Sequence, residues 1–399
     1  MARLLLVGLV AALLLAADVT AVTLVKGDSK PFTSSVKPSE ECPSLRIAII
    51  NGVSFHFEIL AGLLHVLQPY EKYVDVYMSP WIRRENYDGA WDLVRWSKAN
   101  FRSMSEKIAD KKLRYDLVVL VSPDYELEQN KLLLEQMRPA LTVAIVHNAD
   151  FGNMTRLLGL SDPLELLTLS PHVAASLAAA TQRPTDWILP VYPVRPEPDC
   201  TRETGAGSIV GMCLRGFAMQ GKFSNLRRNY TSVWAQMGSR LEQLNDPQIG
   251  KVFHMNVLGK GPDRLNLPDV LTPHVTVHRR LPFGAFYNVI CHNLALVPSL
   301  ANAKYFTHKF SSTVITSLST GTPMITNDRM LDAYTFLEKD AMFYQAAGEP
   351  EIDAMLRISA SPDASILATR KALKQLRYKL NDRAFGMLEA YIRRVCKPE

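Results

Sequence analysis

Short apolar runs alternate with amphipathic stretches through the first half of the chain. Residues 46–50 form the first run, which ends at an Asn51-Gly52 turn, and residues 55–67 follow with apolar positions at helical spacing. Further runs of strand length are residues 74–78, 117–121, 142–146 and 166–169. Strands that are apolar on both faces and separated by helices are typical of parallel sheets. Residues 44–189 are therefore predicted to form a Rossmann-like domain.

The pattern stops at residues 190–207, where prolines and glycines interrupt it, and this predicts a linker. A second series of apolar runs follows, and we expect strands at residues 208–213, 252–258, 275–278, 294–297 and 324–326. These runs predict a second Rossmann-like domain over residues 208–363. Residues 364–394 have the pattern of one or two long helices with a basic face. In doubly wound sheets, ligands bind at the carboxyl ends of the strands.

The segment at residues 309–328 has the order of residues expected for an anion site at the start of a helix, KFSSTVITSLSTGTPMITND. Ser311 or Ser312 is predicted to cap a helix whose free backbone N–H groups and positive dipole end would attract a phosphate. Lys309 would add a counter-charge and Thr313 a further capping group. The helix should stop at Gly321 and lead into a buried strand. The same serines would also be present if they only capped the helix and no ligand bound there.

This segment resembles the donor-binding signature of GT-B glycosyltransferases, especially the group-1 type, and the order of strands over residues 45–395 is similar to theirs. The resemblance implies an α/β fold of two doubly wound Rossmann-like domains facing a central cleft. It also implies that residues 364–399 pack back on the N-terminal acceptor domain, and that residues 208–363 bind a nucleotide-sugar donor. Retention of anomeric configuration is expected, although His308 and Thr316 stand where the retaining enzymes usually carry two Glu.

The resemblance also implies roles for individual residues near the reacting groups. His147, after the strand at 142–146, would contact the donor sugar as a neutral imidazole. Arg215 and Lys222, expected to follow the strand at 208–213, would neutralise the departing diphosphate. Arg227 and Arg228 compete for that role.

Other positions are expected to hold the donor. Asn51 and Gly52 form the first strand-to-helix turn, where a glycine permits close approach of the backbone. His56 and Glu58 follow on the helix and are expected to point to solvent rather than to act as a base. The predicted donor-binding set is Asn51, Gly52, Gly259, Arg279, Lys309, Ser311, Ser312 and Thr313.

Composition limits the function classes. The chain has 399 residues, 47% hydrophobic and 21% charged, which suits two globular cores. Its net charge of +6 is compatible with a diphosphate ligand or with an ordinary basic surface. It has no basic block with interleaved aromatics, so nucleic-acid binding is not indicated. No motif with metal-ligand spacing is present, and neither a metal nor a cofactor is expected; the nucleotide sugar would be a substrate.

The N-terminus predicts entry into the secretory pathway. Arg3 precedes an apolar run at residues 4–17, which indicates a signal peptide over residues 1–21 cleaved near Ala21, or alternatively a single membrane anchor. Residues 22–43 would form a flexible stem. The protein is expected in the ER or Golgi lumen or outside the cell.

Two further features bear on that compartment. Sequons at Asn153 and Asn229 predict a glycoprotein, and a disulfide between Cys42 and Cys200 is expected, because both lie at domain edges.

The functional prediction is a metal-independent glycosyltransferase, with hexose the expected sugar, acting on an acceptor glycan, protein or lipid. The alternative is a catalytically inactive GT-B module that binds a sugar or a partner protein, as the missing acids suggest. A sugar-nucleotide epimerase or a phosphorylase is a third alternative. The sequence indicates neither the acceptor nor the nucleotide base.

Overall fold

The structure is a computed structural model that describes residues 32, 42–105, 114–200 and 208–396. The predicted signal peptide or anchor and nearly all of the predicted stem lie outside the described residues. Within the described ranges, no helix is both long and apolar enough to cross a bilayer.

The first lobe is built on a seven-stranded sheet in the order β3-β2-β1-β4-β5-β6-β7, with every neighbouring pair parallel. Its central strands are buried along their whole length, as the apolar runs predict. The strands are β1 (Ile47–Asn51), β2 (Val74–Met78), β3 (Asn100–Ser103), β4 (Leu117–Leu120), β5 (Leu141–Val146), β6 (Leu164–Thr168) and β7 (Thr185–Trp187).

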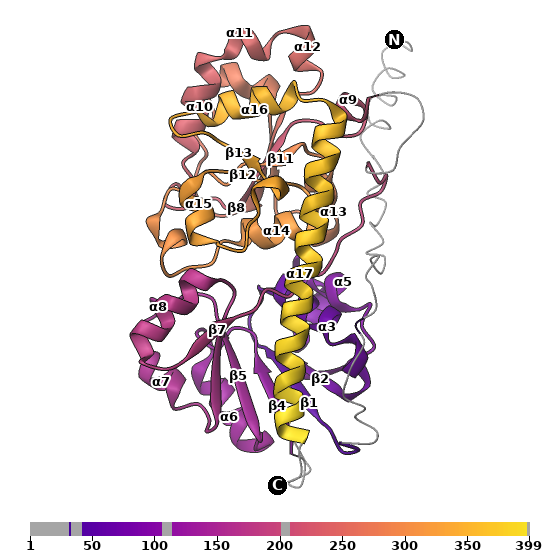
Figure 1. Cartoon of the computed structure of the whole chain (residues 1–399), viewed down its shortest axis with the longest axis vertical. Coiled ribbons are helices and arrows are strands. Elements are labelled where there is room, and N and C mark those ends of the chain that lie inside the picture. The colour runs from indigo at the N-terminus through magenta and orange to yellow at the C-terminus, as the bar shows by residue number, and fades with distance from the viewer. Residues whose placement is uncertain (1–31, 33–41, 106–113, 201–207, 397–399) are drawn as a thin grey trace, which may run out of the picture.

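Helices connect these strands and cover the sheet (Figure 1). They are α3 (Phe57–Val66), η1 (Gln68–Tyr73), α4 (Pro80–Glu85), η2 (Tyr87–Gly89), α5 (Ala90–Val94), α6 (Leu127–Met137), α7 (Met154–Leu158) and α8 (Pro171–Thr181). α8 begins with Ser170 at the N-cap position and Pro171 as the first helical residue.

The second lobe holds a four-stranded parallel sheet, β10-β9-β8-β11, and a parallel pair, β12-β13, joined through a bridge between Leu296 and Met324. Its strands are β8 (Phe217–Lys222), β9 (Met255–Lys260), β10 (Val275–Arg279), β11 (Ala295–Leu296), β12 (Ile325–Thr326) and β13 (Phe343–Tyr344). Its helices are α9 (Ile209–Met212), α10 (Tyr230–Ser239), α11 (Leu241–Leu244), α12 (Pro247–Gly250), η3 (Asp269–His274), α13 (Phe283–Cys291), η4 (Ala303–Phe306), α14 (Ser312–Thr320), α15 (Asp328–Ala333), η5 (Lys339–Ala341) and α16 (Glu351–Ser359). Two parallel sheets, each with its own helices, confirm the predicted α/β class of two Rossmann-like domains.

One predicted strand is wrong. Residues 208–213 are not a strand but the short turn α9, in which Gly211 has a φ of 85°. Asp363 holds this turn by accepting hydrogen bonds from the Ser208 hydroxyl and the Ile209 N–H. The first strand of this sheet is instead β8, which places Arg215 before the strand and Lys222 at its end.

The last helix, α17 (Asp363–Cys396), is a single 34-residue helix that runs along both lobes (Figure 1). In the second lobe it packs on α14 and η5, and in the first lobe on α3 and β4. The Glu389 carboxylate accepts a hydrogen bond from the Tyr70 hydroxyl, and the Asn381 amide bonds both the N–H and the C=O of Val191. The first part of the expected linker is therefore packed against this helix.

The predicted disulfide is also wrong. Cys42 pairs with Cys396, and Cys200 pairs with Cys213. α17 brings the end of the described chain back to its beginning, so Cys42 meets Cys396 rather than Cys200. Cys291 is a buried free thiol, and burial raises its pKa to about 12.

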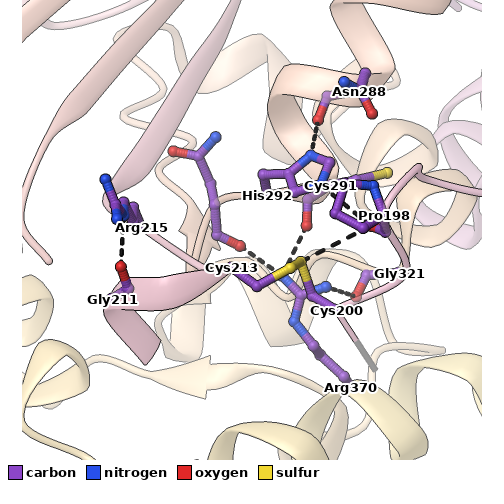
Figure 2. Close-up of a disulfide and its surroundings, with 11 residues drawn as sticks. Pro198, Cys200, Gly211, Cys213, Arg215, Asn288, Cys291, His292, Gly321 and Arg370 are labelled. Atoms are coloured by element: carbon purple, nitrogen blue, oxygen red, sulfur yellow. Dashed lines mark hydrogen bonds between the residues drawn. A yellow bond between two sulfur atoms is a disulfide. The ribbon is translucent and has the colours of Figure 1, made fainter. Parts of the chain in front are cut away.

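Two buried arginines of α17 close the carboxyl ends of helices in the second lobe. Arg370 donates to the carbonyl oxygens of Gly321, Cys291 and Asn293, as Figure 2 shows in part. Arg377 donates to the carbonyls of Leu318 and Ser319 at the end of α14. Burial lowers the pKa of Arg370, to about 10. A cation at a helix C-terminus interacts favourably with the helix dipole, so both charges stabilise α14 in its orientation.

We predict that Arg370→Met lowers the free energy of unfolding by about 3 kcal/mol, because three carbonyl oxygens lose their donor. Urea denaturation measures the change. Lys374→Met, at an exposed position of the same helix, is the matched control and should alter stability by no more than about 0.5 kcal/mol. Equal effects of the two substitutions would show that Arg370 has no special role.

Candidate functional site

A small cavity lies between the two lobes at the carboxyl ends of both sheets. It encloses about 50 Å³, far less than a nucleotide sugar fills. Its lining residues come from both lobes: His56, Glu58, Ile59, Tyr125, His147, Asn148 and Leu169 from the first, and Lys309, Phe310 and Ser312 from the second.

Backbone pairing between the lobes forms one wall of this cavity. The Phe310 N–H donates to the His147 carbonyl (3.1 Å), and the Ala149 N–H donates to the His308 carbonyl (2.8 Å). Asn148 and Lys309 form the antiparallel bridge between these two bonds. The segment that follows β5 is thereby held in register with the segment that precedes α14.

The start of α14 faces this cavity. Ser312 is exposed and lines it, and the backbone N–H groups of Ser312 and Thr313 have no acceptor among the residues that the structure describes. Ser311 occupies the N-cap position, but its side chain forms no cap and is fully buried. Its N–H donates to the Tyr334 hydroxyl (3.0 Å), so Ser311 belongs to the interior of the second lobe, not to the anion cradle.

A buried cation lies directly behind the first turn of α14. Arg228 is 3% exposed and donates to the Thr313 hydroxyl (2.9 Å) and to the Gln220 carbonyl (3.1 Å). Thr313 also accepts a hydrogen bond from the Gln220 side chain. Burial lowers the pKa of Arg228, and no salt bridge between described residues includes it. Its uncompensated charge adds to the positive potential at the helix start.

More positive charge gathers at the mouth of the cavity. The pKa of the Lys309 ammonium is lowered by burial and then by the charges of Arg227, Lys304 and Lys222. Lys222 is exposed at the end of β8, so it lies on the cleft side, as the resemblance implies. Like charges that repel one another around an open space favour an anion in that space.

Two stacked histidines form the opposite wall. The ring centroids of His56 and His147 are 3.8 Å apart, and the two ring planes are nearly parallel. The Nε2–H of His147 donates to the Val121 carbonyl (2.6 Å), and the His56 Nδ1 is 2.7 Å from the Ser122 hydroxyl. Burial lowers the pKa of His147 to about 4. Burial, together with the charges of His147 and Lys309, also holds the pKa of His56 well below its usual value. Both rings are therefore neutral near pH 7.

The expectation that His56 and Glu58 point to solvent is wrong. Both line the cavity, because α3 begins at the carboxyl end of β1 and its first turn faces the second lobe. His56 adopts a φ of 61°, a left-handed conformation that is costly outside glycine and is often found at functional sites. Burial raises the pKa of Glu58.

An acidic group follows β4 on the same side of the cleft. The Asp124 Oδ1 is buried and has no hydrogen-bond partner among the described residues, and Tyr125 beside it lines the cavity. Burial raises the pKa of Asp124 to about 6, against the opposing effect of the Lys309 charge. Tyr125 is 54% exposed and packs edge-on against Phe55, which presents an aromatic surface at the cavity mouth.

Several predicted residues do not join this group. Arg215 lies before β8, at the amino end of the strand, and its Nε–H donates to the Gly211 carbonyl. It is therefore at the opposite edge of the sheet from the cleft, and the predicted contact with a departing diphosphate is wrong. The error follows from the misplaced strand. Arg228, which competed for that role, supports the helix start instead.

Asn51 ends β1 and Gly52 follows it, but neither lines the cavity. Asn51 is buried and donates from its amide to the Phe55 carbonyl (3.3 Å). A Cβ at Gly52 would overlap the Glu126 carboxylate, so the close approach that this glycine permits is to a residue of its own lobe.

Gly259 and Arg279 lie at the carboxyl ends of β9 and β10, as predicted. A Cβ at Gly259 would overlap the Gly221 carbonyl oxygen, which explains the need for glycine there. Arg279 lies over the Phe223 ring, with its guanidinium carbon 4.8 Å from the ring centroid. Lys260, next to Gly259, forms an ion pair with Asp88 of the first lobe.

The one grouping with metal-ligand spacing in the described ranges is Cys200, Cys213 and His292. Its two sulfurs are joined in a disulfide, and it lies away from the cleft.

Comparisons with known proteins agree with this architecture. No family profile and no curated protein sequence matches the chain. Among solved structures, Anabaena HepE in complex with UDP and glucose is 11% identical, with a TM-score of 0.57 over 87% of this chain and 100% of HepE. A glycosyltransferase from Rickettsia africae is 9% identical, with a TM-score of 0.56 over 88% of this chain and 98% of its own. The chain thus has the GT-B fold, which confirms the resemblance at the level of fold.

Sequence reasoning missed Asp124 and Tyr125 as site residues. The signal was present, since Ser122, Asp124 and Tyr125 directly follow a buried run at 117–121, where ligands of such sheets bind.

We predict that stability falls with acidification between about pH 6.5 and pH 4, by about 3 kcal/mol for His147 alone. In this pH range His147 binds a proton in the unfolded chain, whereas its buried imidazole stays neutral in the native protein. Urea denaturation as a function of pH measures the slope. His147→Gln, which keeps an N–H for the Val121 carbonyl, should flatten it, and an unchanged slope would contradict a neutral buried His147.

Proposed function

We propose that the protein is a glycosyltransferase that moves a sugar from a nucleotide diphosphate donor to an acceptor hydroxyl. The observation that carries the proposal is the start of α14, where two backbone N–H groups with no acceptor among the described residues face a cavity lined by Lys309, whose ammonium lies within the influence of the Lys222 and Arg227 charges. A helix start with free amides and nearby cations suits a diphosphate.

We propose UDP as the nucleotide of the donor, because HepE, which shares the fold, was solved with UDP and with UDP-glucose. The cavity encloses about 50 Å³, so the lobes must part for a donor to enter. The inter-lobe contacts that opening would break include the ion pairs Lys260–Asp88 and Lys304–Asp150, beside the backbone pairing of residues 147–149 with 308–310. Ion pairs that keep contact with solvent contribute little stability, so these two pairs oppose opening only weakly.

In the reaction we propose, the bond between the sugar C1 and the β-phosphate oxygen breaks, and the oxygen leaves with the electron pair. The α14 amides and Lys309 stabilise that charge without a divalent ion. The acceptor oxygen bonds to C1 and its proton passes to Asp124, whose unpartnered Oδ1 lies beside the cavity-lining Tyr125. Displacement by this route inverts the configuration at C1, so product stereochemistry distinguishes it from retention.

We also propose that the protein acts within the secretory pathway. Two disulfides tie the described chain, and such bonds persist in oxidising compartments. Both sequon asparagines, Asn153 and Asn229, are exposed and accessible to glycosylation.

The donor site predicts a nucleotide-specific gain of stability. UDP should raise the unfolding temperature, and at about 100 times its Kd the gain is about 2.7 kcal/mol. Ser312→Trp and Lys222→Ala should remove the gain, because the first fills the helix start and the second removes a cation beside it. Lys374→Ala, which removes an exposed cation of α17 that lines neither cavity, is the matched control and should keep it. Thermal-shift measurements with UDP, GDP and ADP test this, and no gain with any of them would refute the donor site.

Asp124→Asn should lower kcat by about 100-fold or more while leaving UDP binding intact, because the amide cannot accept the acceptor proton. In the unaltered enzyme kcat should rise with pH to a plateau above about 6, as Asp124 loses its proton. Turnover assays from pH 5 to pH 8 with radiolabelled donor measure both effects. Full activity in Asp124→Asn would exclude this base. Binding of UDP without turnover of any donor by the unaltered protein would favour the inactive sugar-binding module.

A further inference from the structure

A cavity larger than the one in the cleft lies elsewhere in the second lobe. It measures about 550 Å³ and lies at the amino ends of β8, β9 and β10, the opposite edge of the second sheet from α14's first turn. Its polar lining consists of Arg215, Lys251, His254, His274, His292, Asn256 and Asn293. We call it the basic cavity.

The basic cavity is positively charged without compensation. Two permanent cations and three imidazoles line it, and none of its lining residues carries a carboxylate. The Arg215 side chain donates from Nε to the Gly211 carbonyl, and its two terminal amino groups have no partner among the described residues (Figure 2). The Lys251 ammonium likewise has no acceptor in the described part of the chain.

Neighbouring polar side chains hold two of the lining histidines in place. The Nε2–H of His274 donates to the Asn245 side-chain oxygen (3.0 Å). The Nε2 of His254 pairs with the Thr276 hydroxyl (2.7 Å). Burial, followed by the charges of His274 and His278, lowers the pKa of His254, which agrees with a positive potential in this region.

Three backbone oxygens at the end of α13 that could repel an anion are already engaged. α13 ends at this cavity, and the carbonyls of Cys291 and Asn293 turn to the buried Arg370. The His292 carbonyl accepts the Arg215 N–H (2.8 Å), and its Nδ1 pairs with the Asn288 carbonyl (Figure 2). The Cys200–Cys213 disulfide fixes the turn that carries Arg215. The cavity is therefore a braced structure that presents donors and cations.

We propose that the basic cavity is a second binding site, distinct from the cleft, for a ligand that carries phosphate or sulfate groups. Arg215 offers two free donors in a planar fork, which suits a tetrahedral oxyanion, and Lys251 offers a point charge. The volume admits a ligand of disaccharide size. The inference does not depend on the proposed transferase activity, because it uses no residue of the cleft.

Isothermal titration calorimetry of the oxidised full-length protein at low ionic strength tests the proposal. Pyrophosphate and a sulfated disaccharide are titrated separately. The ligand that binds with the lower Kd shows whether the cavity prefers phosphate or sulfate groups. Both titrations use the Ser312→Trp variant, in which the cleft is blocked, alongside the unaltered protein. The Arg215→Ala/Lys251→Ala double variant removes the two cations, and Lys371→Ala/Lys374→Ala removes two exposed charges of α17 as the matched control.

At least one ligand should bind equally well to the unaltered protein and to Ser312→Trp, and about tenfold or more weaker to the Arg215→Ala/Lys251→Ala variant. The control should bind as the unaltered protein does, and added salt should weaken binding. The proposal is overturned if neither ligand binds, if Ser312→Trp abolishes binding, or if the double variant and the control behave alike. Unchanged unfolding temperatures of both double variants show that the comparison concerns binding rather than folding.

Discussion

The antiparallel backbone pairing between residues 147–149 and 308–310 is the constraint on which the rest of the site depends. It joins the end of β5 in one lobe to the segment before α14 in the other. Because these bonds fix the two segments in register, the stacked histidines and the free amides of the helix start face the same cavity. Without this pairing, each lobe would carry half of a site.

Electrostatic support for the anion site extends through the second lobe. Arg228 contributes a buried charge behind the first turn of α14, and Arg370 and Arg377 approach the carbonyls at its other end. All three arginines are buried and hydrogen-bonded to neutral groups. Their desolvation costs free energy that a bound anion would partly recover. α17 supplies two of these charges and also packs on both lobes. The same helix therefore adds to the positive potential at the anion site and holds the two lobes in position.

Apolar runs were sufficient to predict the fold class. Central strands such as β2 and β5 were placed within a residue of their observed bounds, because a buried parallel strand shows an uninterrupted apolar run. The strand expected at residues 208–213 is wrong, because these apolar residues form a turn that a disulfide braces. Only tertiary contacts distinguish such a turn from a strand such as β8. This misplaced strand explains why Arg215 was wrongly assigned to the cleft. Ser312, Lys309 and His147 were also assigned to the cleft, and they do line its cavity. The role of Ser311 could not be foreseen, since its partner Tyr334 is 23 residues away.

The most direct test of the account is to observe the amides of the α14 start while UDP binds. We predict that in ¹⁵N-labelled protein the resonances of Ser312 and Thr313 shift with added UDP and saturate together, because their N–H groups acquire phosphate acceptors. If UDP binds and shifts other resonances while these two stay in place, the helix start is not the diphosphate site and the central claim fails.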